Sequence, residues 1–128
     1  MAEAPIWNPY AAQCPTRFVL ERIADKWTVL VLNLLAAEPL RFNALLRRID
    51  GLSQKVLSQT LKRMERDGLV HREAFPTVPV TVEYSITPLG RTLAGSLAAL
   101  VQWSGENIEA VLRAQQAYDA RSEGATAS

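Results

Sequence analysis

Long cationic and amide side chains recur between residues 53 and 66, at spacings that place most of them on one side of a helix. The set comprises Ser53, Gln54, Lys55, Ser58, Gln59, Lys62, Arg63 and Arg66. Lysine and arginine neutralise phosphates, whereas glutamine and serine exchange hydrogen bonds with base edges, so these residue types suit the groove of a double helix. Any solvent-facing amphipathic helix also carries charge outward, and Glu65 and Asp67 reduce the positive field. The neighbouring elements must therefore decide the interpretation.

Apolar residues in the same segment predict the helix that carries this set. Leu57, Leu61 and Met64 repeat at the spacing of one helical face, which is expected to pack inward. Ser53 is suited to capping the amino end, and Gly68 supplies the left-handed residue that often follows a helix. The helix is therefore expected to start at about Ser53 and to end before Gly68.

A shorter helix is expected immediately before it. Residues 44–49 carry an apolar stripe preceded by Phe42, and Asn43 is expected to cap this helix. The Asp50-Gly51 pair ends it and forces a turn. A short helix, a glycine turn and a longer polar-faced helix form the helix-turn-helix arrangement. Arg41 and Asn43, at the start of the first helix, are therefore further candidate DNA contacts.

Two strands are predicted after the helices, over residues 69–75 and 81–86. Residues 76–80 connect them and contain Pro76 and Pro79, which lack backbone amide donors and so belong in a loop or at an edge. A hairpin that follows a helix-turn-helix is the wing of a winged helix. Its tip is expected to be exposed.

The wing offers few residues suited to DNA. Arg72 and Thr77 are the candidate contacts to the DNA backbone or minor groove. Glu73 and Glu83 indicate instead that much of the wing faces solvent, and Tyr84 is expected to be a core or hinge aromatic.

Taken in order, these motifs resemble those of the HxlR-type winged helix-turn-helix transcriptional regulators of bacteria. The motifs are Cys14-Pro15, Asp25-Lys26-Trp27, PLRFN at 39–43, GLSQKVL at 51–57, ERDGLV at 65–70 and VEYSITPLG at 82–90. The resemblance covers Cys14 to about Trp103, and motifs in this order are highly specific.

The resemblance implies a homodimer that binds an inverted-repeat operator in double-stranded DNA. The helix that starts near Ser53 would read the operator, and the wing would touch flanking DNA. In several relatives the cysteine that matches Cys14 senses quinones, aldehydes or oxidants. Other relatives respond to unknown signals, so the resemblance implies the DNA function more firmly than the input signal.

Length and composition fit one small α+β domain that is mostly α. The 128 residues amount to about one domain, and 48% hydrophobic content is enough for a packed core. The expected architecture is a winged helix-turn-helix with a two-stranded wing and N- and C-terminal dimerisation helices. The expected boundaries are an N-terminal arm at 1–15, a winged-helix domain at 16–120 with a C-terminal helix at about 88–116, and a disordered tail at 121–128.

Charge and composition exclude several classes of protein. The formal net charge is +1, so any DNA affinity must come from clustered cations rather than from overall charge. No apolar run approaches the ~20 residues that cross a bilayer, and no secretory signal is visible, so no membrane partner is expected. A single cysteine fits a reducing cytoplasm. No cofactor or metal site is expected, since no phosphate loop or metal-ligand cluster is visible.

The last predicted helix carries more apolar surface than one small domain can cover. It starts at Thr87-Pro88, a capping residue followed by a proline at the first helical position. A second copy of the chain is the expected cover, making a homodimer. The expected interface comprises Trp7, Tyr10 and Phe18 of the N-terminal segment with Leu97, Val101, Ile108 and Leu112 of this helix. The alternative is that the helix folds back on its own domain.

Cys14 supports two interpretations. It lies before Pro15 at the expected start of the first helix, where backbone amides and the nearby Arg17 favour a reactive thiolate that senses oxidants or electrophiles. A free cysteine is also commonly just a small buried hydrophobe. With one cysteine per chain, an oxidised form must be a disulfide between subunits, a mixed disulfide, a sulfenic acid or an alkylated adduct.

Catalysis is not expected, although one enzymatic alternative exists. His71 is the only histidine and lies in a predicted strand, and Cys14 has no evident base near it in sequence. A cysteine hydrolase that uses His71 as its base is the enzymatic alternative.

Two non-enzymatic alternatives stay open. The chain could be a protein-interaction adaptor, because winged helices also serve that role. It could also be a regulator controlled by a small aromatic effector held between the terminal helices, with Trp7, Trp27 and Trp103 as walls, although ordinary packing explains these tryptophans equally well.

Overall fold

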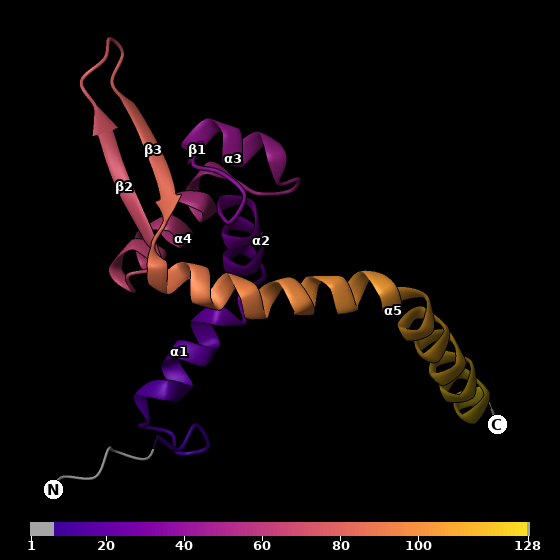
Figure 1. Cartoon of the computed structure of the whole chain (residues 1–128). Helices are drawn as coiled ribbons and strands as arrows, with labels where there is room; N and C mark the ends of the chain where they lie inside the picture. Colours follow the sequence, from indigo (N-terminus) through magenta and orange to yellow (C-terminus); the bar gives the residue numbers. More distant parts are fainter. Residues whose placement is uncertain (1–6, 128) are drawn as a thin grey trace, which may run out of the picture. The chain divides into compact units, whose positions relative to one another are not determined.

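The computed structural model describes residues 7–127, and the side chains of residues 7–124, as a mostly helical α+β chain. Its elements are α1 (Pro15–Ile23), α2 (Lys26–Leu35), β1 (Leu40–Arg41), α3 (Phe42–Arg48), α4 (Gln54–Arg66), β2 (Val70–Phe75), β3 (Thr81–Ile86) and α5 (Pro88–Ala127). Figure 1 shows the long β2–β3 hairpin projecting beyond α4, with β1 and α3 beside β3. The predicted winged helix-turn-helix is confirmed.

The chain divides into two compact units, one ending at Ala94 and the other beginning at Gly95. The first contains the three strands, α1 to α4 and the first residues of α5, and the second contains the rest of α5. The arm at 1–15 and the domain at 16–120 stay predictions, because compactness alone does not define a folding domain. Residues 1–6 of the arm lie outside the described residues.

Local sequence signals determine the turn of the helix-turn-helix and the two ends of α4, as predicted. Gly51 adopts a φ of 80°, a left-handed conformation that makes the turn after α3. The Ser53 hydroxyl then accepts from the Val56 backbone N–H at 3.1 Å and caps α4. Gly68, with a φ of 79°, follows the carboxyl end of α4.

The expectation that Asn43 caps α3 is wrong. The cap position is Arg41, whose extended backbone (φ −80°, ψ 159°) belongs to β1, and no side chain caps this end. Pairing of Arg41 with Glu83 holds the chain in the sheet up to that residue, so the helix starts directly at Phe42. Asn43 is therefore already inside the first turn.

The sheet has three antiparallel strands in the order β1-β3-β2. The β2–β3 hairpin runs from the Val70–Ile86 pair to the Phe75–Thr81 pair, which matches the predicted wing. The third strand, β1, was not predicted; its Leu40 lies opposite Tyr84. A two-residue strand is too short to show the alternation by which strands are recognised in sequence.

The core of the first unit lies between α2, α3 and α4. Its most deeply buried side chains are Val31, Leu32, Leu35, Leu45, Leu57, Thr60, Leu61 and Met64. In α2, Leu30 is exposed whereas Leu32 is fully buried. Continuous apolar sequence from Val29 to Leu32 leaves the orientation of this helix undetermined until the other helices pack on it.

α5 begins as predicted but is longer than predicted. The Thr87 hydroxyl accepts from the Gly90 backbone N–H at 3.0 Å. The helix continues to Ala127 rather than ending near residue 116, and residues 121–127 are helical where a disordered tail was expected. Strong helix formers, chiefly alanine, arginine, glutamine and glutamate, make up most of residues 113–123, which explains the extension. Ser128 lies outside the described residues.

No helix within residues 7–127 combines the length and the hydropathy that a membrane span requires.

Candidate nucleic-acid interface

α4 presents its polar set to solvent because its other face is fixed in the core. Leu57, Thr60, Leu61 and Met64 are each no more than 1% exposed, so the helix cannot rotate without opening the core. Most of the predicted contact residues are exposed: Ser53, Gln54, Lys55, Gln59, Lys62, Arg63 and Arg66; Ser58 is half-buried. This outer face is therefore open to a ligand.

The cations of α4 are not equivalent. Lys55, Lys62 and Arg66 have no ion-pair partner within residues 7–127, so their charge is available to a ligand. Arg63 instead pairs with Asp25, the residue that caps α2, at 3.1 Å. A carboxylate of the same chain therefore offsets part of its charge. The sequence grouped Arg63 with the others because a pair across 38 residues leaves no local signal.

A groove of about 660 Å³ separates the start of α3 from β3 and the wing tip. Arg41 and Asn43, both predicted contacts, are exposed and line it. Arg47 also lines it and was missed, although its spacing of one turn from Asn43 is a signal that could have found it. Arg48 differs from Arg47, since it pairs with Glu38 at 3.2 Å and does not line this groove.

The two predicted wing contacts behave differently. Arg72 is exposed on β2. The Thr77 hydroxyl donates to the Pro79 carbonyl at 2.7 Å and lies 3.2 Å from the Thr81 hydroxyl. Because phosphate oxygens accept hydrogen bonds, a hydroxyl whose proton is already used is poorly placed to bind them. Thr77 therefore orders the loop, whatever further contact it makes.

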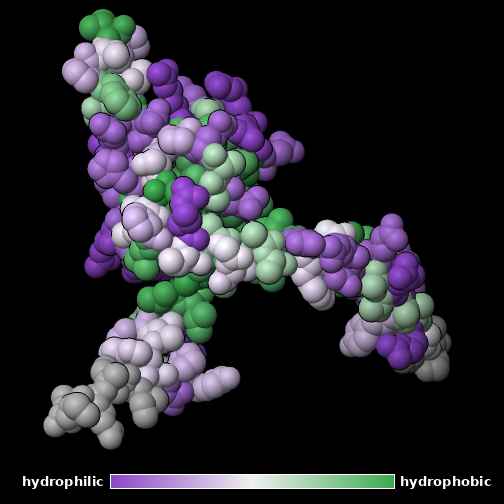
Figure 2. Space-filling view, viewed as in Figure 1, coloured by the Kyte–Doolittle hydropathy of each residue, from purple (hydrophilic) through white to green (hydrophobic). Residues whose placement is uncertain are grey.

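The wing tip, residues 76–80, carries no charge and is strongly exposed. Val78 is 101% exposed and Val80 is 66% exposed. Figure 2 shows this apolar tip at the far end of the hairpin. The two valines therefore form a small exposed apolar surface on a loop that is ordered by internal hydrogen bonds.

Cys14 occupies the capping position of α1 and is 9% exposed. Burial raises the pKa of its thiol, but a hydrogen bond with the Thr16 side chain and three backbone hydrogen bonds outweigh this effect, so the pKa is lowered overall. The backbone partners belong to Thr16, Arg17 and Asn8. Arg17 thus acts through its backbone, whereas the sequence suggested an effect of its charge.

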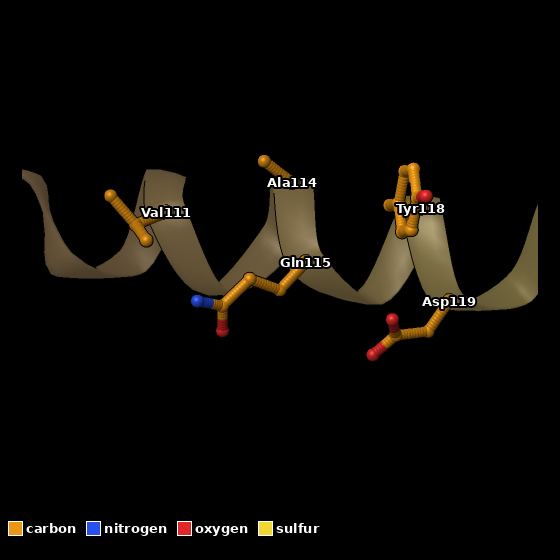
Figure 3. Close-up of a pocket in the computed structure, with 5 residues that line it drawn as sticks. All are labelled: Val111, Ala114, Gln115, Tyr118 and Asp119. Carbon is orange, nitrogen blue, oxygen red and sulfur yellow. The ribbon is translucent and has the colours of Figure 1, made fainter.

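The candidate dimer residues divide by exposure. Trp7, Tyr10, Phe18, Ile108 and Leu112 are exposed, Val101 is half-buried, and Leu97 is buried within the single chain. On α5, a shallow hollow is lined by residues of this one helix, Val111, Ala114, Gln115, Tyr118 and Asp119 (Figure 3). It is a helix face rather than an enclosed pocket.

Residues 22–112 match the model of the HxlR-like helix-turn-helix family. The chain belongs to this family. The match spans most of the chain, from the end of α1 to the middle of α5. The HxlR-like fold thus includes both helices of the helix-turn-helix, the wing and a large part of α5.

Named relatives agree with the HxlR-like assignment. The chain is 45% identical over 105 residues to the uncharacterized HTH-type transcriptional regulator YtfH of Escherichia coli K12, covering 82% of this chain and 83% of that protein. The structure of the ytfH regulator of Salmonella typhimurium has a TM-score of 0.83 and 40% identity, covering 87% of this chain and 99% of that one. The structure of the redox regulator HypR in its reduced form has a TM-score of 0.71 and 33% identity, and the match covers 77% of this chain and 98% of HypR.

The chain is therefore an HxlR-type transcriptional regulator with a helix-turn-helix DNA-binding fold. The family and these relatives are regulators rather than enzymes. Cys14 and His71, the pair considered for catalysis, lie on separate elements, with His71 exposed on β2. Across residues 7–127, no three His, Cys, Asp or Glu residues gather closely enough to hold a metal ion.

Proposed function

We propose that this HxlR-type regulator binds an inverted-repeat operator as a homodimer, with α4 of each chain in the major groove of one half-site. The observation that carries the proposal is the outer face of α4. Lys55, Gln59 and Lys62 are exposed and unpaired in the described chain, on a helix whose opposite face is fixed in the core.

Different residues of α4 would contact the phosphates and the base edges. Lys62 and Arg66 would contact phosphates, which supplies affinity for any duplex sequence. Gln59 would read a base edge, because its amide can donate and accept a hydrogen bond at adenine. Arg41 and Asn43 would position the start of α3 against the backbone, and Arg72 would contact DNA from the wing.

A second copy of the chain would place two such helices on one face of the duplex. Exposed aromatic and aliphatic side chains support this assembly at both ends of the chain, with Trp7, Tyr10 and Phe18 near the N-terminus and Ile108 and Leu112 on α5. These surfaces would be buried between chains rather than left in water.

Cys14 would couple the regulator to oxidants or electrophiles. Its lowered pKa favours the thiolate, which is the nucleophilic form. The relative HypR is itself named a redox regulator. Modification of Cys14 would shift the dimer interface and thereby the separation of the two recognition helices. If Cys14→Ser releases operator DNA under oxidant to the same extent as the wild type does, this part of the proposal is wrong.

Selection from a pool of randomised duplexes tests the DNA function and identifies the operator in the same experiment. The full chain is expected to enrich an inverted repeat whose half-site centres lie about 10 to 10.5 bp apart, or a multiple of that, with two chains per duplex. Gln59→Ala should relax the base preference at one position of each half-site. Lys62→Ala should instead weaken binding to all duplexes equally. No enrichment and no salt-sensitive duplex binding would favour a protein-interaction adaptor instead.

A further inference from the structure

We propose that the ion pair between Arg22 and Asp67 sets the half-site spacing that the dimer accepts. The pair joins α1 to the carboxyl end of α4. It fixes the angle between α1 and the winged-helix body, which consists of α2 to α4 and the three-stranded sheet. Arg22 and Asp67 are thus positioning residues rather than DNA contacts. The inference rests on the proposed function, because it requires two α4 helices on one duplex.

α1 is held to the winged-helix body without a buried side chain. None of its nine residues is buried, and Phe18, Val19 and Leu20 are each about half exposed. Figure 1 shows α1 leaving the end of α2 and running away from the strands. Three consecutive helical residues span about 200° of the circumference, so most of α1 needs cover from outside its own chain. In the proposed homodimer the second copy supplies that cover.

Two ion pairs reach α4, but only one of them starts from α1. Asp25 lies three residues after Arg22, yet it pairs with Arg63 at 3.1 Å, whereas Arg22 pairs with Asp67 at 2.5 Å. The Asp25 pair joins α2 to α4 and so lies within the winged-helix body. The Arg22 pair crosses the junction of Ala24 and Asp25, which connects α1 to that body.

The position of Asp67 does not favour α4 itself. Asp67 is the C-cap of this helix, where the negative end of the helix dipole opposes a carboxylate. Its side chain is only 26% exposed, and that of Arg22 is 40% exposed, so the pair is partly removed from solvent. Charge-assisted hydrogen bonds are stronger where water screens them less. The carboxylate therefore serves the contact with α1.

The ion pair lies at the opposite end of α4 from Lys55, so a small change of angle is amplified. α4 has 13 residues, which make a length of about 20 Å at a rise of 1.5 Å per residue. A turn of about 10° about its carboxyl end therefore moves its amino end by about 3.5 Å, close to one base-pair step of about 3.4 Å. The angle at Arg22 thus decides which spacing two α4 helices match.

Binding to duplexes of altered spacing tests the proposal. The two selected half-sites are moved apart or together by one base pair, and affinity is compared with that for the selected spacing. A partly exposed ion pair favours its geometry by about 1.4- to 5-fold, so two pairs per dimer favour one spacing by about 2- to 30-fold. Arg22→Ala should lower the spacing preference by this factor and keep the wild-type salt slope.

Arg63→Ala is the matched control. It removes an ion pair of similar exposure from the same helix, but that pair lies within the winged-helix body. The variant should therefore keep the wild-type spacing preference. Combining Arg22→Asp with Asp67→Arg should restore the preference that Arg22→Ala loses, because the reversed pair joins the same two helices.

A distance measurement without DNA reports the geometry directly. Spin labels on Gln54→Cys, in a Cys14→Ser background, give the distance between the amino ends of α4 in the dimer. With the pair intact the distribution of distances should be narrow. Arg22→Ala should broaden it, whereas Arg63→Ala should not.

The outcomes separate this inference from the proposed function. If Arg22→Ala weakens binding at all spacings equally, or keeps both the spacing preference and the narrow distance distribution, the pair does not set the spacing. If the wild type shows no salt-sensitive duplex binding, the proposed function fails, and an unbroadened distribution in Arg22→Ala then overturns the inference independently. A monomeric wild type would overturn both.

Discussion

The guanidinium of Arg63 on α4 donates to the carboxylate of Asp25 at 3.1 Å, and so joins the candidate recognition helix to the start of α2. The same carboxylate caps α2 by accepting from the Trp27 backbone N–H at 3.3 Å. A second ion pair joins Arg22 of α1 to Asp67, at the end of α4. Arg63 therefore helps to hold α4 in place, although it belongs to the solvent-exposed face of that helix.

We predict that Arg63→Ala affects stability rather than DNA binding. The pair is about half-exposed at the arginine, so its removal should cost no more than about 1 kcal/mol of unfolding free energy. Lys62→Ala, the neighbouring residue, should leave thermal stability unchanged and reduce the salt slope of duplex binding by about 0.9 per phosphate no longer neutralised. Calorimetry and salt titration of both variants separate the two roles, and a reversed pattern would show that Arg63 contacts DNA.

A buried hydroxyl on the inner face of α4 gives a second prediction. The Thr60 Oγ1 is buried and has no hydrogen-bond partner in the structure, and the residue is 0% exposed. Burial of an unpaired polar group costs about 1 to 3 kcal/mol, and valine has nearly the shape of threonine. Thr60→Val should therefore raise the free energy of unfolding by about 1 kcal/mol, measured in urea, without changing duplex affinity. A decrease in stability would reveal a partner for this hydroxyl.

Sequence reasoning located those parts of the fold that local chemistry determines. Ser53 caps α4 and glycines at 51 and 68 bound it, because each depends on a few neighbouring residues. Strand β3 was found because Val82, Tyr84 and Ile86 alternate with polar residues, a pattern that is visible in sequence.

The parts that sequence reasoning missed depend on contacts between distant segments. β1 exists only because Leu40 and Arg41 pair with Tyr84 and Glu83 of β3, far along the chain. Arg47 becomes a candidate contact only when the wing tip lies across the groove from α3. The pairing of Arg63 with Asp25 likewise requires the packed helices.

Gly90 is predicted to be the least replaceable glycine. A methyl group there would lie 2.1 Å from the Leu69 carbonyl oxygen and 2.9 Å from a carbon of Ile86. The backbone cannot yield cheaply, so Gly90→Ala should destabilise the chain by about 3 kcal/mol or more, beyond ordinary overpacking. Gly95→Ala is the control, because nothing lies within 4 Å of the added methyl group and alanine favours helix by roughly 0.5 to 1 kcal/mol. Equal urea midpoints for the two variants would contradict the close packing at Gly90.

The Cys14 thiol gives a prediction about how its rate of alkylation depends on pH. Burial raises its pKa, but hydrogen bonds to Thr16 and neighbouring backbone groups lower it further than burial raises it. The rate of alkylation should therefore reach half its maximum at a lower pH in the native protein than in the unfolded chain, where the pKa of the thiol is not lowered. Thr16→Val should move that midpoint upward, whereas Gln13→Ala should not. An unshifted midpoint in Thr16→Val would mean that the Thr16 hydroxyl does not stabilise the thiolate.

The same pKa shift predicts how stability depends on pH. Folding lowers the pKa of the thiol, so the native state binds fewer protons than the unfolded chain between the two pKa values. The stabilisation from Cys14 should be fully present above the unfolded pKa and should be lost as pH falls through the folded pKa. Cys14→Ser should lack this dependence, and parallel stability curves for the two proteins would contradict it.

Recognition of DNA by the outer face of α4 underlies the proposed function, and the salt dependence of operator binding is its decisive measurement. With the selected duplex, we predict that the combined variant Lys55→Ala, Lys62→Ala and Arg66→Ala keeps the wild-type thermal stability, since these side chains are exposed and unpaired in the described chain. Its slope of log affinity against log salt should be shallower by about 0.9 for each phosphate contact removed. If the folded variant binds the duplex with the affinity and salt slope of the wild type, a surface other than the outer face of α4 contacts the DNA.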